Sequence, residues 1–213
     1  MIAKEGRIIL IPLFLVTFTL GIFAHAWEST PLSILYGVLG FFFLFSLNFF
    51  RDPQRVIPMD EKLIISPADG KVVRVEDIHD PNVGESAKIV SIFLNVFNVH
   101  ANRVPIEGIV ESVERKSGKF LAAFDHKASD ENEQVITVLV NYSGKYIIKQ
   151  IAGLIARRIL CYAEVGTKMH KGERLGFIRF GSRTDLIMPS HVAVQVELGQ
   201  KVIGGETIIG KIK

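Results

Sequence analysis

The chain has 213 residues, which is room for one domain of ordinary size and a short additional segment. A formal net charge of +3, without a dense run of Lys and Arg, argues against a nucleic-acid-binding protein. The single cysteine excludes an internal disulfide, and no segment has the ligand spacing of a metal site, so no metal is expected.

Two apolar segments near the N-terminus, residues 8–24 and 31–50, contain no charged residue. Crossing the hydrocarbon core of a membrane takes about 20 apolar residues, and about 17 is the lower limit. The second segment is therefore long enough, and the first is marginal unless it extends to Trp27, which suits a headgroup boundary. The polar turn 28–30 is short enough to be only a hairpin tip. The sequence predicts a transmembrane helical hairpin within residues 1–58.

Basic residues on both sides of the hairpin predict its orientation. Lys4 and Arg7 precede the apolar segments, and Arg51 and Arg55 follow them. The positive-inside rule then places both ends, and the rest of the chain, on the cytoplasmic side of the cell membrane. A hairpin that enters one leaflet without crossing stays an alternative. A signal peptide is less favoured, because a second full-length apolar segment follows the first.

The remaining residues, 59–213, follow a polar linker that contains proline and have the pattern of a mainly β domain. Short runs rich in Val and Ile alternate with turn residues, which favours strands over helices. The expected strands are 63–65, 70–75, 88–94, 108–113, 135–140, 146–151, 159–165, 174–180, 185–188, 192–196 and 206–212. One segment, 119–127, has Phe and Leu at helical spacing and predicts a short helix.

A weak internal repeat indicates the architecture of this domain. Residues 166–178 contain Gly-x-Lys, Gly-Glu and Gly-x-Ile in that order, and they align with residues 199–212 after one inserted residue. Paired glycine-turn strands of this kind resemble the barrel-sandwich fold of lipoyl and biotinyl carriers. The expected fold is therefore a mainly β, barrel-sandwich-like catalytic domain. A carrier would present a lysine between the repeats, but residues 181–200 contain none.

Three local features contain residue types that are used in catalysis. Asp69 lies in a tight turn, His100 ends an apolar strand, and Gly181-Ser182 is the only Gly-Ser step in the chain. An Asp, a His and a Ser can supply an oriented base and an activated hydroxyl. Each feature alone is more simply a turn, a satisfied histidine or a loop, so the argument depends on their occurring together.

These features occur in the order of a known family. The matching segments are 66–70, 95–105, 127–133, 150–159 and 180–183. From about Met59 onward the chain resembles the phosphatidylserine decarboxylase proenzyme family, in its short archaeal-type branch, which includes archaetidylserine decarboxylases. The better-known long members carry a second histidine where this chain has Arg103. Their self-cleavage site also differs at the residue after Gly-Ser, which is Arg183 here.

The resemblance implies two stages of chemistry. In the first, the Ser182 hydroxyl attacks the Gly181 carbonyl, with His100 as the base and Asp69 holding it. The chain is cut before Ser182, and that residue becomes a covalent pyruvoyl group, the implied cofactor. In the second, the amine of a phosphatidylserine-type lipid forms a Schiff base with this group, carbon dioxide leaves, and His100 returns a proton.

The resemblance also implies the partners of the enzyme. The large chain 1–181 and the small chain 182–213 would form a heterodimer at the membrane that contains the phospholipid, and further dimerisation stays open. The lipid backbone, diacylglycerol or archaeal ether, is also open. The lipid phosphate needs cationic partners. The candidates are Arg103, Lys127, Arg157, Arg158 and Arg183.

Two other functions remain as alternatives. A membrane-tethered carrier or phosphocarrier would follow from the glycine-turn repeat, with His170 or His191 accepting the phosphate. A serine hydrolase would use Asp69, His100 and Ser182, although the chain has no nucleophile-elbow motif. The mass of the purified protein separates the decarboxylase from the hydrolase, because only the decarboxylase cuts its own chain.

Overall fold

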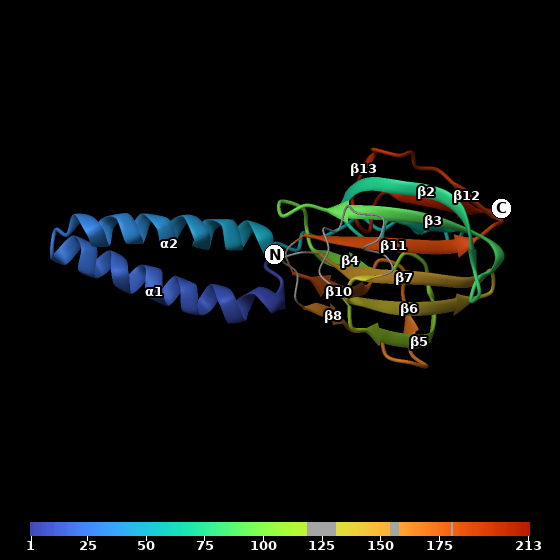
Figure 1. The fold of residues 1–213 in the computed structure, drawn as a ribbon, viewed down its shortest axis with the longest axis horizontal. Coiled ribbons are helices and arrows are strands. Elements are labelled where there is room, and N and C mark those ends of the chain that lie inside the picture. Colours follow the sequence, from blue (N-terminus) through green and yellow to red (C-terminus); the bar gives the residue numbers. More distant parts are fainter. Residues whose placement is uncertain (119–130, 154–157, 180) are drawn as a thin grey trace. The chain divides into compact units, whose positions relative to one another are not determined.

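The computed structural model describes residues 1–118, 131–153, 158–179 and 181–213 (Figure 1). The chain forms two compact units, Met1–Gln54 and Arg55–Lys213. Ile57, which lies within the expected linker, belongs to the second unit, where its side chain lies against Gly172. The helix expected at 119–127 lies outside the described residues.

The first unit is a pair of helices. A short 3-10 turn, η1 (Lys4–Gly6), leads into α1 (Arg7–Ala26), and α2 (Thr30–Phe49) follows after a tight turn at Glu28, whose φ is 47°. Pro31 stands in the first turn of α2, where its missing N–H would have had no helical partner. Both helices are long and apolar enough to cross a membrane, by length and composition.

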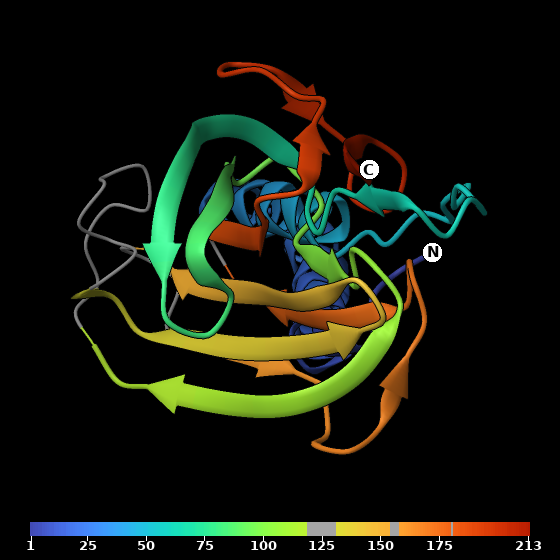
Figure 2. The same cartoon turned by 90° about the vertical axis from the view of Figure 1, so that its right-hand side faces the viewer.

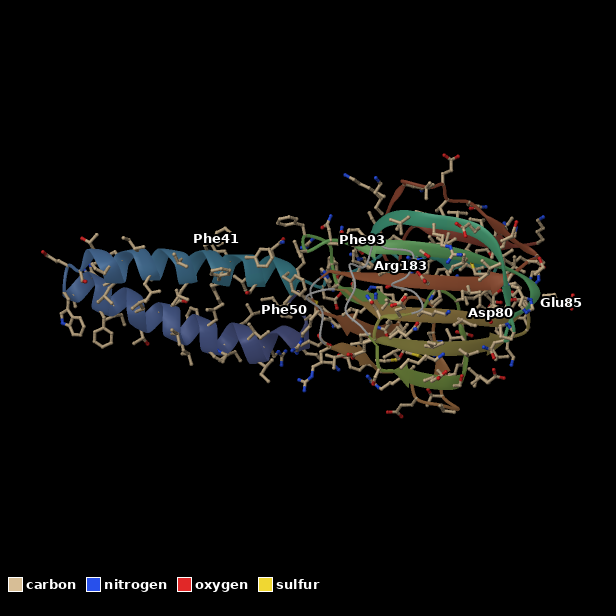
Figure 3. All side chains as sticks on the ribbon, in the orientation of Figure 1. Phe41, Phe50, Asp80, Glu85, Phe93 and Arg183 are labelled. Carbon is tan, nitrogen blue, oxygen red and sulfur yellow. The ribbon has the colours of Figure 1, made fainter. Side chains whose placement is uncertain are left out.

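The two helices contact each other along one side. The rings of Phe14 and Phe43 lie 5.7 Å apart, and Gly21 leaves room for the ring of Tyr36. Away from this contact the helices expose large apolar side chains within their unit, such as Phe41, which is 66% exposed (Figure 3). Exposed apolar surface of this extent is typical of a segment that contacts lipid.

The second unit is mainly β, as predicted. Its strands are β1 (Leu63–Ile65), β2 (Gly70–Asp80), β3 (Gly84–Leu94), β4 (Ala101–Arg103), β5 (Gly108–Lys116), β6 (Gln134–Asn141), β7 (Gly144–Ala152), β8 (Ile159–Cys161), β9 (Lys168–Met169), β10 (Arg174–Ile178), β11 (Ser182–Pro189), β12 (Val192–Val194), β13 (Lys201–Val202) and β14 (Ile208–Ile212). Every expected strand is present, with different ends in most cases. The short strands β4, β9 and β13 were not expected.

Eight strands form one antiparallel sheet in the order β13-β2-β3-β11-β7-β6-β5-β9. The sheet curls, so that one of its faces is the inside of the domain (Figure 2). Strands β3, β11 and β7 contribute Val90, Leu94, Ile148, Leu186 and Met188 to the main apolar core. Two three-stranded sheets, β1-β14-β12 and β4-β10-β8, complete the domain. Strand β11 therefore has neighbours on both sides, β3 and β7.

The internal repeat predicted from the sequence has a structural counterpart. Gly166 and Gly172 in the first copy, and Gly199 and Gly205 in the second, have φ values of 82°, 81°, 88° and 87°. Glycine adopts this left-handed conformation without the steric cost of a side chain. Each copy has a two-residue strand, β9 or β13, followed by a five-residue strand, β10 or β14. The repeat is thus one of turn geometry as well as of sequence.

Candidate active site

Ser182 is the first residue of β11 and pairs with Leu94 on β3 and with Ala152 on β7. Its side chain is fully buried, and its Oγ forms no hydrogen bond with any group in the described part of the chain. Gly181, just before it, has a φ of 61° and open space where a Cβ would stand. The bond between the two residues therefore joins a left-handed glycine to a buried serine.

The ring of His100 is held in a defined tautomer. His100 is fully buried, and its Nδ1 lies 2.9 Å from the carbonyl oxygen of Asn98. A carbonyl oxygen only accepts hydrogen bonds, so Nδ1 carries the proton. In the neutral ring Nε2 then has the lone pair that a general base requires.

Backbone contacts bring the His100 segment to the end of β11. The N–H of Ile178 donates to the carbonyl oxygen of His100 at 3.2 Å. Ile178 also packs in a small buried cluster with Ala152, the β7 residue that pairs with Ser182. The histidine and the serine, which lie 82 positions apart in the sequence, are thus gathered at one end of the β domain.

A buried polar network continues from this point on the inner face. Asn102 donates through Nδ2 to Oγ1 of Thr184 at 3.1 Å, and its Oδ1 accepts from Nε2 of Gln150 at 2.8 Å. These bonds fix the orientation of both amide groups, because each donor faces an acceptor. Oε1 of Gln150 is buried and has no hydrogen-bond partner among the described residues. It is an acceptor available to a ligand with an N–H or O–H group.

Asp69 has a different environment from the one expected. Its two carboxylate oxygens each lie 2.9 Å from Nη2 of Arg55, and Oδ1 also accepts from the N–H of Gly204 at 2.8 Å. The turn that carries Asp69 is joined to β4, because the N–H of Arg103 donates to the carbonyl oxygen of Pro67. That Asp69 holds the His100 ring stays a prediction, since the measured contact of Nδ1 is with Asn98.

Arg183 and Asp185 form an ion pair on the face of β11 opposite to Ser182. Nε of Arg183 lies 2.6 Å from Oδ1 of Asp185, and Nη2 donates to Oγ of Ser91 at 2.7 Å. The side chains of the ion pair are 1% and 0% exposed. Asp185 therefore already neutralises Arg183, one of the cations expected to bind phosphate. The sequence analysis did not identify this ion pair.

The other cations expected to bind phosphate lie in several places. Arg103 donates through Nη1 to the carbonyl oxygen of Gly172 at 3.2 Å, and Arg158 is exposed. Lys127 and Arg157 lie outside the described residues. The phosphate-binding role of these residues stays a prediction. Among the described residues, no group of His, Cys, Asp and Glu is arranged to hold a metal ion.

Glu107, Lys168 and His170 form a separate charged cluster at strand β9. Glu107 contacts Nζ of Lys168 and Nδ1 of His170, each at 2.7 Å. The hydrogen bonds from Lys168 and then from His170 hold the pKa of Glu107 below its usual range. These residues line a surface pocket of about 520 Å³ whose lining includes none of the expected catalytic residues. His170, considered as a phosphate acceptor, is thus already bonded to a carboxylate.

Comparisons with known proteins identify the family of the chain. Residues 42–210 match the family model described as phosphatidylserine decarboxylase. A protein of Cupriavidus pinatubonensis named phosphatidylserine decarboxylase proenzyme is 42% identical, over 100% of this chain and 95% of its own length. Proteins of the same name are 44% identical in Wolbachia sp. subsp. Brugia malayi, over 99% and 91%, and 47% identical in Geobacter metallireducens, over 84% and 81%.

These matches place the chain among the pyruvoyl-dependent decarboxylases, so it is an enzyme. More narrowly, it belongs to the phosphatidylserine decarboxylase family. The family predicted from the five sequence segments is therefore confirmed, while the archaeal-type branch stays a prediction. Asn102, Gln150 and Thr184 received no role in the sequence analysis, although the first two lie within the matching segments.

Proposed function

We propose that this chain is a proenzyme that cuts itself before Ser182 and then decarboxylates the serine headgroup of phosphatidylserine to ethanolamine. The observation that carries the proposal is the position of Ser182, which is buried directly after a left-handed glycine. Membership of a family whose relatives are named proenzymes supports it. Archaetidylserine has the same headgroup chemistry and is the alternative substrate.

The cut is assigned to the chain's own residues. Nε2 of His100 accepts the proton of the Ser182 hydroxyl, and Oγ attacks the carbonyl carbon of Gly181. The C–N bond between the two residues breaks, and an ester replaces the amide. Elimination then releases the carboxylate of Gly181 and leaves dehydroalanine at position 182. Water hydrolyses the imine form of dehydroalanine, ammonia leaves, and a pyruvoyl group remains.

The surroundings of residue 182 fit such a group. The pyruvoyl group would supply a carbonyl that condenses with the amine of the headgroup and takes up the electrons left by carbon dioxide. Oε1 of Gln150 is available to accept an N–H of the headgroup. His100, buried beside the same end of β11, is the proposed proton donor after carbon dioxide leaves. Burial of these residues limits the access of water to the reacting atoms.

Residues around the catalytic pair are given supporting roles. Asp69 forms an ion pair with Arg55 and is proposed to stabilise its own turn. This turn accepts a hydrogen bond from Arg103 on β4, so Asp69 would indirectly support the position of His100. Arg103 and Arg158 are the proposed partners of the lipid phosphate in the described part of the chain, with Lys127 and Arg157 as further candidates.

The helical hairpin is assigned to anchoring. Helices α1 and α2 have the length and composition to cross a membrane, and their flanking basic residues favour a cytoplasmic catalytic domain. A phospholipid headgroup lies at the membrane surface, so tethering the domain there raises the concentration of substrate around the site. The large and small chains would remain together as a heterodimer.

Intact mass spectrometry of the full-length protein under denaturing conditions tests the proposal. We expect two chains, split before Ser182, the smaller with a blocked N-terminus, and conversion of phosphatidylserine in detergent micelles to phosphatidylethanolamine. Ser182→Ala should stay whole and inactive, while Ser190→Ala, an exposed serine just after β11, should behave as the parent. A whole parent chain that is folded and still decarboxylates the lipid would overturn the proposal.

A further inference from the structure

The Arg183 cluster, formed by Arg183, Asp185 and Ser91, lies beside the bond that is proposed to break. Asp185 and Ser91 are register partners on β11 and β3, and Arg183 pairs with Phe93 at the same end of these strands (Figure 3). The guanidinium bonds both Asp185 and Ser91, at 2.6 and 2.7 Å. The guanidinium therefore connects two residues near the start of β11, Arg183 and Asp185, to each other and to Ser91 on the neighbouring strand β3.

Cleavage would remove a restraint from the start of β11. In the uncut chain residue 182 is held by the backbone on both sides, whereas after the cut it is a chain end, and chain ends fray. Conversion to a ketone also removes the N–H of residue 182, so this position can no longer donate a hydrogen bond. The reacting carbonyl would then stand on the least restrained residue of the strand.

We propose that the Arg183 cluster is a positioning device that holds the end of β11 in register once the chain has been cut. The proposal rests on the self-cleavage proposed above. Arg183 is the residue directly after position 182, and its side chain lies on the opposite face of the sheet from Ser182. It acts on the reacting atoms only through the backbone, by keeping residue 182 between Leu94 and Ala152.

A buried Arg–carboxylate pair suits this task. The planar guanidinium presents several N–H groups in fixed directions, so bonds to two acceptors define its orientation. Because both charges are almost fully buried, separating them would leave each without water and without its partner. The cluster therefore resists the outward movement that fraying of the strand end would require.

The test uses the full-length protein with both charges of the pair removed, as Arg183→Met with Asp185→Asn. Removing both avoids a single unpaired buried charge, which could prevent folding. The matched control is Lys145→Met with Glu111→Gln, on β7 and β5. Nζ of Lys145 lies 2.7 Å from Oε2 of Glu111, the two side chains are 39% and 45% exposed, and Lys145 lies at the other end of β7 from Ala152, the partner of Ser182.

Three measurements are made on the cut protein, and the first is repeated in an uncut Ser182→Ala background. Hydrogen exchange of the amides of residues 183–186 should be about tenfold faster in the cut double variant and nearly unchanged in the uncut one. The kcat for phosphatidylserine in detergent micelles should fall by about tenfold to a hundredfold, with KM unchanged. The ketone should react faster with hydroxylamine added without lipid. The control variant should match the parent throughout.

Parental exchange rates and kcat in the cut double variant would overturn the proposal. So would an equal rise in exchange before and after cleavage, because the pair would then be merely structural, and so would a folded double variant that stays uncut. Should the double variant not fold, Ser91→Ala removes one hydrogen bond and must show the same effects at smaller size. Failure of the proposed function is seen separately, as a parent chain that is not split before Ser182.

Discussion

The two faces of strand β11 are both buried, yet the neighbouring side chains of Ser182 and Arg183, on opposite faces, differ in their hydrogen bonding. On the inner face, the hydroxyl of Ser182 has no hydrogen bond within the described residues. On the outer face, Arg183 and Asp185 are bonded to each other and to Ser91. Successive residues of a strand point to opposite faces, so one short segment can carry an unbonded hydroxyl on one face and a bonded ion pair on the other. The hydroxyl proposed to react is thus left without a hydrogen bond among the described residues, while its immediate neighbour is held in place.

The largest effect on stability is expected on the outer face. In the uncut Ser182→Ala background, Arg183→Met leaves Asp185 buried without its main partner, which should lower the free energy of unfolding by about 3–5 kcal/mol. Adding Asp185→Asn should recover most of this loss. Urea denaturation measures both variants. Lys145→Met, which breaks an exposed pair with Glu111, should cost less than about 1 kcal/mol, and an equal loss there would contradict the contrast between buried and exposed pairs.

The inner face should respond to the loss of its fixed amide. Gln150→Met removes the donor to Oδ1 of Asn102 and should lower the free energy of unfolding by about 1–3 kcal/mol. It also removes the acceptor proposed for the headgroup amine, so KM for phosphatidylserine should rise. Gln195→Met, at an exposed position, is the matched control. An unchanged KM in a folded, cut Gln150→Met protein would remove that residue from the proposed headgroup contacts.

The junction before β11 can be tested with two glycines of similar geometry. Gly181→Ala and Gly166→Ala each force a side chain into the left-handed region, at about 1–2 kcal/mol, with open space around the new Cβ. Both should lose similar stability in the uncut background. Only Gly181→Ala should slow the appearance of the small chain, followed by denaturing gels over time, because only this residue carries the carbonyl that Ser182 is proposed to attack. Slowing by both would mean that cleavage reports on general stability.

The smallest effect is expected at the exposed Glu107 cluster, which contrasts with the buried pair on β11. The pKa of Glu107 is lowered by Lys168 and then by His170, so the carboxylate is stabilised in the folded state. This contribution is present above the ordinary glutamate pKa of about 4.3 and is lost as the pH falls through the lowered value. Urea denaturation of Glu107→Gln should show slightly lower stability than the parent at pH 7, and this difference should shrink as the pH is lowered below the ordinary glutamate pKa.

The sequence predicted the strands well where apolar residues were continuous. Runs of Val and Ile gave most of β3, β6 and β7, because these strands are largely buried and such residues favour strands. The start of β11, residues 182–184, was missed, since Gly-Ser-Arg-Thr is the composition of a loop. These polar residues are part of the sheet because β3 and β7 pair with them and bury them. A local sequence pattern carries no information about such neighbouring strands.

The residues of the candidate site came from the sequence and their catalytic roles stay predictions, whereas most of their contacts could not be predicted. Ser182, Gly181 and His100 came from segments that resemble a family, and the structure gathers their backbones at one end of the domain. The partner of Asp69, Arg55, lies in the segment expected to be a linker. Ser91, the partner of Arg183, is 92 positions away in sequence. Such distant pairs depend on strand order and register, which one sequence alone does not provide.

The order of the strands gives the proposed cut a consequence for folding. Residues 182–213 provide β11 between β3 and β7, β14 and β12 beside β1, and β13 beside β2. A separated small chain would therefore have to insert β11 into the interior of the large sheet and at the same time add strands to β1 and β2. Refolding of the cut enzyme becomes a reaction between two molecules that depends on their concentration, whereas the uncut chain keeps every strand on one polymer. Synthesis as a single chain would thus make assembly efficient, and the proposed cut would follow folding as a step that cannot simply be reversed.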